Sequence, residues 1–182
     1  MREIENSTGL VLINSSIYFT AHERTEMKHK FKSNDMEIFF LEQRSIQNSF
    51  LDGLEIILNN NLFNIIAGGL IMPATYDLLK KSLVTIVKKI RSSNILILRA
   101  NKDAKPTKAI IKVKTEIGEF IAPIDQEISE DKVEEYINAF VKGYKAAKVS
   151  GNKNQYFIVD KSSDQTLEVL LLSDYLKKHN KL

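Results

Sequence analysis

The spacing of apolar side chains changes along the chain, and the N-terminal part has the short runs typical of β-strands. Residues 9–13 are a short apolar run, residues 17–20 are β-branched and aromatic, and residues 36–41 form another run of this kind. These three segments predict N-terminal strands. The segment 21–34 between them is polar and has no clear period.

The middle of the chain has apolar residues at helical spacing. From Ser45 on, the pattern predicts a helix that ends or bends at the asparagine run Asn59–Asn61. A second apolar stretch, 62–72, contains two adjacent glycines. Pro73 then fits the first turn of a further helix, where its missing N–H would be unpaired in any case. The apolar positions of the first helix are Ile46, Phe50, Leu54, Ile57 and Leu58, and those of the helix after Pro73 are Leu79, Leu83, Ile86, Val87 and Ile90.

Strand-like runs return after this helix. Residues 94–99, 109–113 and 119–122 predict strands, and the last two predict a hairpin that turns near Gly118, where a positive φ is easily adopted. Two more strands are predicted near the C-terminus, at 155–160 and 166–172. A short helix or frayed tail follows them.

The clearest helix of the chain lies between these two groups of strands. Ser129 is its expected N-cap, and Gly151 marks its end. We expect its apolar face to pack on a sheet that includes residues 95–98 and 111–113. That face consists of Val133, Tyr136, Ile137, Phe140, Val141 and Tyr144.

Together these segments predict an α+β fold. It has N-terminal strands, two to three central amphipathic helices, and then a ββ(β)αββ unit around a mostly antiparallel sheet. No segment repeats, and no linker rich in Pro, Gly or Ser divides the chain. We therefore predict one domain over residues 1–182, with a weak sub-boundary near 92–94.

The composition narrows the classes of protein. Of the 182 residues, 43% are hydrophobic and 27% are charged, which is typical of a globular chain. The absence of cysteine excludes disulfide frameworks, thiolate zinc sites, iron–sulfur clusters and cysteine nucleophiles. It also fits a reducing compartment, and the acidic N-terminus does not resemble a signal peptide, so we expect a cytoplasmic location. The excess of Lys over Arg, with many Ile and Asn, is typical of AT-rich coding and indicates a bacterial source.

The charge is segregated into blocks. Residues 77–115 contain eleven basic and two acidic residues, whereas residues 116–135 contain eight acidic residues and one lysine. The two blocks can pair inside the fold, or the basic block can form a surface for phosphate groups. It contains no aromatic residue for base stacking, so binding through it would not depend on base sequence. The candidate polyanion-binding residues are Lys80, Lys81, Lys88, Lys89, Arg91, Arg99, Lys108, Lys112 and Lys114.

Two other groups carry metal-binding or catalytic residue types. His22, Glu26 and His29 would share one face of a helix, but helical zinc motifs place histidines at i and i+4, and position i+4 is Glu26. Asp125, Glu130 and Lys132 follow the acid-acid-x-Lys order of metal-dependent nucleases, but the last two open a helix, where acids are ordinary first-turn residues. We therefore assign no catalytic, cofactor-binding or metal-binding residue and expect no cofactor.

Three further features have structural explanations. Gly68 and Gly69 are not followed by the Lys-Ser/Thr of a phosphate loop, so they indicate a bend or close packing. Asp160 and Asp164 bracket a turn. The uncharged run 56–76 has the length of a membrane helix, but its most apolar part, 62–72, is too short to span a bilayer and is expected in the core.

The leading functional hypothesis is a non-enzymatic interaction or regulatory module, such as an adaptor, inhibitor or immunity-type subunit, that acts by protein–protein contact. Its expected partner is another protein or a second copy of the chain. The first alternative is nucleic-acid or polyanion binding through residues 77–115, without sequence preference. Further alternatives are an enzyme of unrecognised type and a membrane-active protein that uses 62–72 and the basic helix after it, with a membrane the least expected partner.

Overall fold

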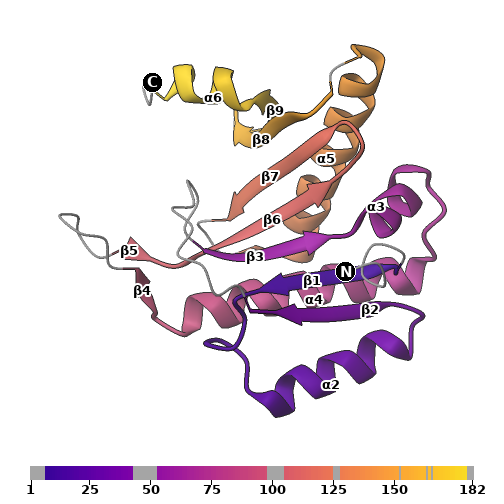
Figure 1. The fold of residues 1–182 in the computed structure, drawn as a ribbon, viewed down its shortest axis with the longest axis vertical. Coiled ribbons are helices and arrows are strands. Elements are labelled where there is room, and N and C mark those ends of the chain that lie inside the picture. Colours follow the sequence, from indigo (N-terminus) through magenta and orange to yellow (C-terminus); the bar gives the residue numbers. More distant parts are fainter. Residues whose placement is uncertain are drawn as a thin grey trace.

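The computed structural model describes most of the chain and contains five helices, one seven-stranded mixed sheet and a separate two-stranded ribbon in its described part (Figure 1). The α+β class predicted from the sequence is confirmed. The described residues are 7–42, 53–97, 105–124, 128–151, 153–162, 164 and 166–179.

The large sheet contains strands from the N-terminal, middle and C-terminal parts of the described chain. Strands that precede residues 92–94 and strands that follow them are hydrogen-bonded to one another within it. Strands β4 (Leu96–Ile97) and β5 (Lys105–Pro106) form the small ribbon at one end of the molecule. In spatial order the large sheet comprises β2 (Glu37–Leu41), β1 (Gly9–Ile13), β3 (Gly53–Leu58), β6 (Lys108–Lys114), β7 (Gly118–Ile124), β8 (Gln155–Lys161) and β9 (Leu167–Leu171).

The sheet is mixed, so the expectation of a mostly antiparallel sheet is corrected. The pairs β1–β2, β3–β6 and β7–β8 are parallel, and the other three pairs are antiparallel. In each parallel pair at least one helix lies between the two strands in sequence, because a parallel connection needs a long crossover. Hydrophobic spacing shows the strands but not which of them pair.

Four helices pack on one face of the sheet, and their buried residues form a single apolar core with it. They are α2 (Ala21–Lys32), α3 (Asn60–Ala67), α4 (Pro73–Ser92) and α5 (Glu130–Val149). The short α6 (Leu172–Lys178) packs on the opposite face, where Leu172 and Tyr175 cover Ile110, Ile121 and Ile158.

The two long helices have the boundaries and buried faces that their sequences predict. Pro73 is in the first turn of α4, and the Ser129 hydroxyl accepts a hydrogen bond from the Lys132 amide at the start of α5. Gly151 has a φ of 72° just after α5, a conformation that favours glycine. All five predicted apolar positions of α4 are buried, as are Val133, Tyr136, Ile137, Phe140 and Tyr144 of α5, whereas Val141 is half-buried.

The N-terminal expectations are partly wrong. Residues 17–20 form a turn rather than a strand, with the amides of Tyr18 and Phe19 bonded to the Ser15 carbonyl. The ambiguous segment after it is α2. Thr20 and Glu23 form a reciprocal capping box there, which starts the helix although only Phe31 is fully buried along it.

The helix predicted from Ser45 to Leu58 is also corrected. Residues 53–58 form β3, which pairs with β1 on one side and β6 on the other. Along β3 the buried residues Leu54, Ile56 and Leu58 alternate with less buried ones, as expected for a strand. The apolar positions 54, 57 and 58 also satisfy helical spacing, so the pattern alone did not exclude a helix. The first part of the predicted helix, including Ile46 and Phe50, lies outside the described residues. Asn59 does mark a boundary, because its side chain caps α3 through the Leu62 amide.

Two glycines are required where parallel strands approach closely. A Cβ atom at Gly9 would lie 2.0 Å from the Glu37 carbonyl oxygen, and one at Gly118 would lie 2.1 Å from the Gln155 carbonyl oxygen. Gly118 does begin the second strand of the predicted hairpin, but it is not among the residues with a positive φ. Its role is therefore close approach to β8 rather than turn conformation.

The prediction that residues 95–98 lie in the sheet on which α5 packs is wrong for the part that the structure describes, although Ile95 packs against the edge of the same apolar core. Leu96 and Ile97 belong to the two-stranded ribbon, and Leu98 lies outside the described residues. The other expected contact is correct, since Ile111 and Val113 lie in the core that α5 joins.

Candidate binding site at the end of helix α4

The basic segment 77–115 does not form one continuous surface, because its residues lie on different sides of the sheet. Lys80, Lys81, Lys88, Lys89 and Arg91 belong to α4, on the helix-covered side. Lys112 and Lys114 lie on β6, where they alternate with core residues and therefore point to the opposite face. Arg99 lies outside the described residues.

Two of the α4 lysines bind acids from neighbouring helices. The Lys80 ammonium lies 3.1 Å from the Glu134 carboxylate of α5 and 3.4 Å from Asp77, and the hydrogen bond with Glu134 is the main cause that raises the pKa of Lys80. The Lys89 ammonium lies 2.6 Å from the Glu23 carboxylate of α2. That hydrogen bond, with those from Thr20, lowers the pKa of Glu23 to about 2. These two lysines therefore join helices to one another.

Lys112 is at the centre of an ion network on the other face. Its ammonium lies 2.8 Å from Glu55 of β3 and 3.4 Å from Glu119 of β7, and its side chain is 14% exposed. Glu119 and Glu134 both come from the acidic segment 116–135, so the two charge blocks meet in the fold at Lys112 and Lys80. Lys114 is exposed beside this network.

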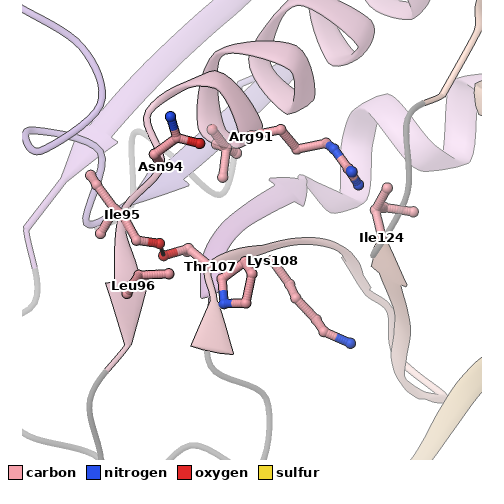
Figure 2. A pocket seen from close by; sticks show the side chains of 9 residues that line it. Arg91, Asn94, Ile95, Leu96, Thr107, Lys108 and Ile124 are labelled. Carbon is pink, nitrogen blue, oxygen red and sulfur yellow. Dashed lines mark hydrogen bonds between the residues drawn. The ribbon is translucent and has the colours of Figure 1, made fainter. Parts of the chain in front are cut away.

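The other basic residues of α4 are Lys81, Lys88 and Arg91, and all three are exposed along the outer side of the helix. Arg91 lies in the last turn of the helix, next to the ribbon β4–β5. There it lines a cavity of about 660 Å³ together with Lys108, the first residue of β6. Figure 2 shows the Arg91 guanidinium beside Ile124, whereas the Lys108 side chain extends to the other side of the chain at the start of β6.

The backbone turns at Asn94, just after α4, before it reaches the cavity wall. Asn94 adopts a φ of 51°, a left-handed conformation that asparagine tolerates better than most residues. The Ile95 carbonyl then accepts hydrogen bonds from the Thr107 amide at 3.1 Å and from the Thr107 hydroxyl at 3.0 Å (Figure 2). These bonds fix the base of the ribbon against the start of β6. Ile95 and Thr107, which both line the cavity, are therefore held together by hydrogen bonds.

The lining combines positive charge with an apolar surface of suitable size for a ligand group. Among the described residues that line the cavity, the polar side chains are Arg91, Asn94, Thr107 and Lys108, and the others are aliphatic. Neither cation is without a partner in the protein. A guanidinium has five donors and an ammonium has three, so each can hold a protein group and a ligand together. The aliphatic lining consists of Ile90, Ile95, Leu96, Pro106 and Ile124. This arrangement fits an anionic group that carries an adjoining aliphatic chain.

The sequence pointed to Arg91 and Lys108 but not to the residues that complete the cavity with them. Asn94 lies in the turn after α4, Thr107 lies between β5 and β6, and Ile124 ends β7, so the three come from separate parts of the chain. The one available local signal was Asn94, a residue that commonly follows a helix in the left-handed conformation.

The other candidate groups do not form a comparable site. His22, Glu26 and His29 lie exposed on α2, with His22 and Glu26 3.4 Å apart. Glu130 and Lys132 lie in the first turn of α5, and Asp125 falls outside the described residues. Within the part of the chain that the structure describes, no three His, Asp or Glu side chains are grouped so that they could hold a metal ion.

The uncharged run 56–76 is divided between elements. Its residues Leu62 and Phe63 are fully buried in α3, whereas Leu70 and Met72 are exposed. Among the described residues, no helix is both long enough and apolar enough to cross a bilayer. Tyr136, Phe140 and Tyr144 belong to the core, as expected.

Comparisons of this chain with protein-family models, with curated proteins and with solved structures find no match.

Proposed function

We propose that this protein is an interaction module that binds an acidic, aliphatic segment of a protein partner in the cavity at the end of α4. The observation that carries the proposal is the placement of Arg91 and Lys108 around one cavity whose other described lining residues are mainly aliphatic. Carboxylates of the bound segment would accept hydrogen bonds from Arg91 and from Lys108, and a neighbouring leucine or isoleucine side chain would contact Ile95 and Leu96. The module would act by contact and not by catalysis.

A protein segment suits this lining better than a nucleic acid does. None of the described residues that line the cavity is an aromatic on which a base could stack, and Lys80, Lys89 and Lys112 are held in ion pairs with protein carboxylates. A phosphate backbone needs a track of several available cations, since each contact contributes a small, salt-sensitive share of the affinity. Nucleic-acid binding through segment 77–115 therefore remains the alternative that the experiment must distinguish.

The test uses two labelled probes and one matched control variant. The probes are a short peptide that alternates glutamate and leucine, and a single-stranded oligothymidine. Arg91→Gln and Lys108→Gln each remove one donor group from the cavity, whereas Lys88→Gln removes the same charge from the outer side of α4. Fluorescence anisotropy measures binding, and the melting temperature checks that each variant remains folded.

We expect the peptide to bind, and each cavity variant to weaken that binding about 10- to 100-fold, because a hydrogen bond to a charged group contributes about 1.5–3 kcal/mol. Lys88→Gln should leave it unchanged. A peptide with glutamine in place of glutamate should not bind. If oligothymidine binds instead and Lys88→Gln weakens it as much as Arg91→Gln does, the nucleic-acid alternative is correct.

A further inference from the structure

The loop between α3 and α4 exposes two large apolar side chains at the periphery of the molecule (Figure 1). Leu70 is 78% exposed and Met72 is 60% exposed. Single exposed apolar residues are common on protein surfaces, but two in one five-residue loop form a local apolar projection. This loop is far in sequence from the α4 cavity residues and shares none of them.

The backbone of the loop is held in place, so the exposure of these side chains is built into the fold. The Gly69 and Leu70 amides donate to the Ile66 and Ile65 carbonyls at 3.0 and 2.9 Å, and Gly69 has a φ of 70°. This is the arrangement by which helices commonly end. Pro73 starts α4 directly afterwards. The chain therefore passes from one helix to the next within five residues, with the Leu70 side chain on the outside of the loop.

The basic side chain of Lys145 on α5 lies beside the loop. A cavity of about 400 Å³ is lined by Gly69 and Ile71 of the loop together with Tyr76, Val141 and Lys145. Lys142, Lys145 and Lys148 are all exposed on this part of α5. The loop itself belongs to the run 56–76, which contains no charged residue.

The nearby carboxylates have cationic partners within the protein. Glu134, which also lines the cavity, shares the Lys80 ammonium with Asp77 of α4, at 3.1 and 3.4 Å. Glu116 accepts a hydrogen bond from the Tyr144 hydroxyl at 2.6 Å and lies 3.9 Å from Lys148. The surface beside Leu70 and Met72 is therefore apolar at the loop and positive along the adjoining turns of α5.

We propose that this surface is a peripheral contact for an anionic lipid bilayer. Leu70 and Met72 enter the boundary between headgroups and acyl chains, while Lys142 and Lys145 meet the lipid phosphates. A bilayer fits better than a protein partner because the apolar side chains project from a tight loop between two helices, whereas a protein interface needs about 800 Å² of complementary surface on each side. Leu62 and Phe63 stay in the core, so the contact lies on the membrane and does not require the whole segment 62–72 to insert.

The test is co-sedimentation of the full chain with two kinds of vesicle. One kind contains phosphatidylcholine and phosphatidylglycerol in a two-to-one ratio, and the other contains phosphatidylcholine alone. We expect the protein to sediment with the anionic vesicles, and high salt to release much of it. Leu70→Ser with Met72→Ser should weaken binding about tenfold or more, and each of Lys142→Gln and Lys145→Gln about fivefold.

Two control variants distinguish binding through this surface from non-specific adsorption to the vesicles. Ile17→Ser removes another exposed apolar side chain, one that lies in the turn before α2, and Lys88→Gln removes an exposed lysine of α4. Both should sediment like the parent, and far-ultraviolet circular dichroism should be the same for all variants. The proposal is wrong if the parent does not sediment with anionic vesicles, if it binds both vesicle types equally, or if Ile17→Ser loses binding as strongly as the loop variant.

Discussion

The sheet has one face covered by α2, α3, α4 and α5, whereas on its other face α6 is the one helix among the described residues that packs. On the covered face, side chains such as Leu12, Ile56, Ile111 and Phe120 are fully buried and form a continuous core. On the opposite face α6 helps bury three isoleucines, and beside them lies the network of Glu55, Lys112 and Glu119.

The difference shows where stability and binding chemistry reside in this molecule. Burial of apolar area is the main favourable contribution to folding, so the covered face supplies most of the stability. The opposite face can carry charged residues near the middle of the sheet because the Lys112 ammonium lies within ion-pair distance of both carboxylates there. The two proposed contact surfaces lie away from the strand centres, at the end of α4 and at the loop before it.

The largest effect is expected from opening the core on the covered face. Phe140 is fully buried in α5, with its ring 6.5 Å from that of Phe120 in an edge-on arrangement. Phe140→Ala should lower the free energy of unfolding by about 3–5 kcal/mol, as measured by denaturant titration. Tyr156→Ala is the matched change on the opposite face, where the side chain is 54% exposed, and should cost much less. Equal losses would show that the two faces contribute alike.

A smaller effect is expected from the ion network. Lys112→Met leaves the Glu55 and Glu119 carboxylates, which are 21% and 16% exposed, without their shared ammonium. We expect a loss of about 1–2 kcal/mol, less than for a fully buried pair because water still reaches the three groups. Adding Glu55→Gln and Glu119→Gln to the same chain should recover most of it. If the single change has no effect, this face tolerates unpaired charge and is more open to solvent than the structure indicates.

The fit between α5 and the edge strand β9 should be tested by adding one methyl group. A Cβ atom at Gly143 would lie 2.9 Å from both Cγ atoms of Val169. Gly143→Ala should therefore be destabilising by about 1 kcal/mol net, because overpacking outweighs the gain in helix propensity. In a double-mutant cycle, Val169→Ala should remove that cost. A stabilising Gly143→Ala would mean that α5 and β9 can separate freely.

The smallest effect concerns how α6 is held on the opposite face. Burial alone would raise the pKa of Asp160, but hydrogen bonds from Lys178 and His179 outweigh it and lower that pKa below its ordinary value. A carboxylate with a lowered pKa contributes stability above its unfolded-state pKa, and the contribution is lost as the pH falls through the folded-state pKa. Below about pH 4, amide hydrogen exchange in α6 should therefore speed up relative to α5. Asp160→Asn should give the faster exchange already at neutral pH, and unchanged α6 exchange in that variant would contradict this account.

Local signals in the sequence account for the elements that were predicted correctly. Pro73 and Ser129 start the two long helices, and the residues that recur at a period of 3.6 are buried in both. The start of α2 also had a local signal, since Thr20 and Glu23 have the spacing of a capping box. The rest of α2 has no amphipathic stripe, which is why the segment 21–34 was ambiguous.

The errors fall where a neighbour in space decides the conformation. Leu54, Ile57 and Leu58 fit helical spacing, but β1 and β6 on either side hold them in a strand. Gly118 suggested a turn with a positive φ, yet its requirement comes from Gln155, which is distant in sequence. The same holds for the cavity at α4. The sequence identified Arg91 and Lys108 as basic residues, but it did not indicate that they line one cavity.

The α+β class, the two long amphipathic helices and the segregation of charge follow from the amino-acid sequence alone, because each of these depends on residues within one or two turns or strands of one another. Which strands run parallel, which lysines form ion pairs and which apolar side chains stay exposed depend on the folded arrangement. Pairing in a sheet and ion pairing between helices depend on distances across the fold, and the spacing of residues along one chain contains no direct measure of those distances.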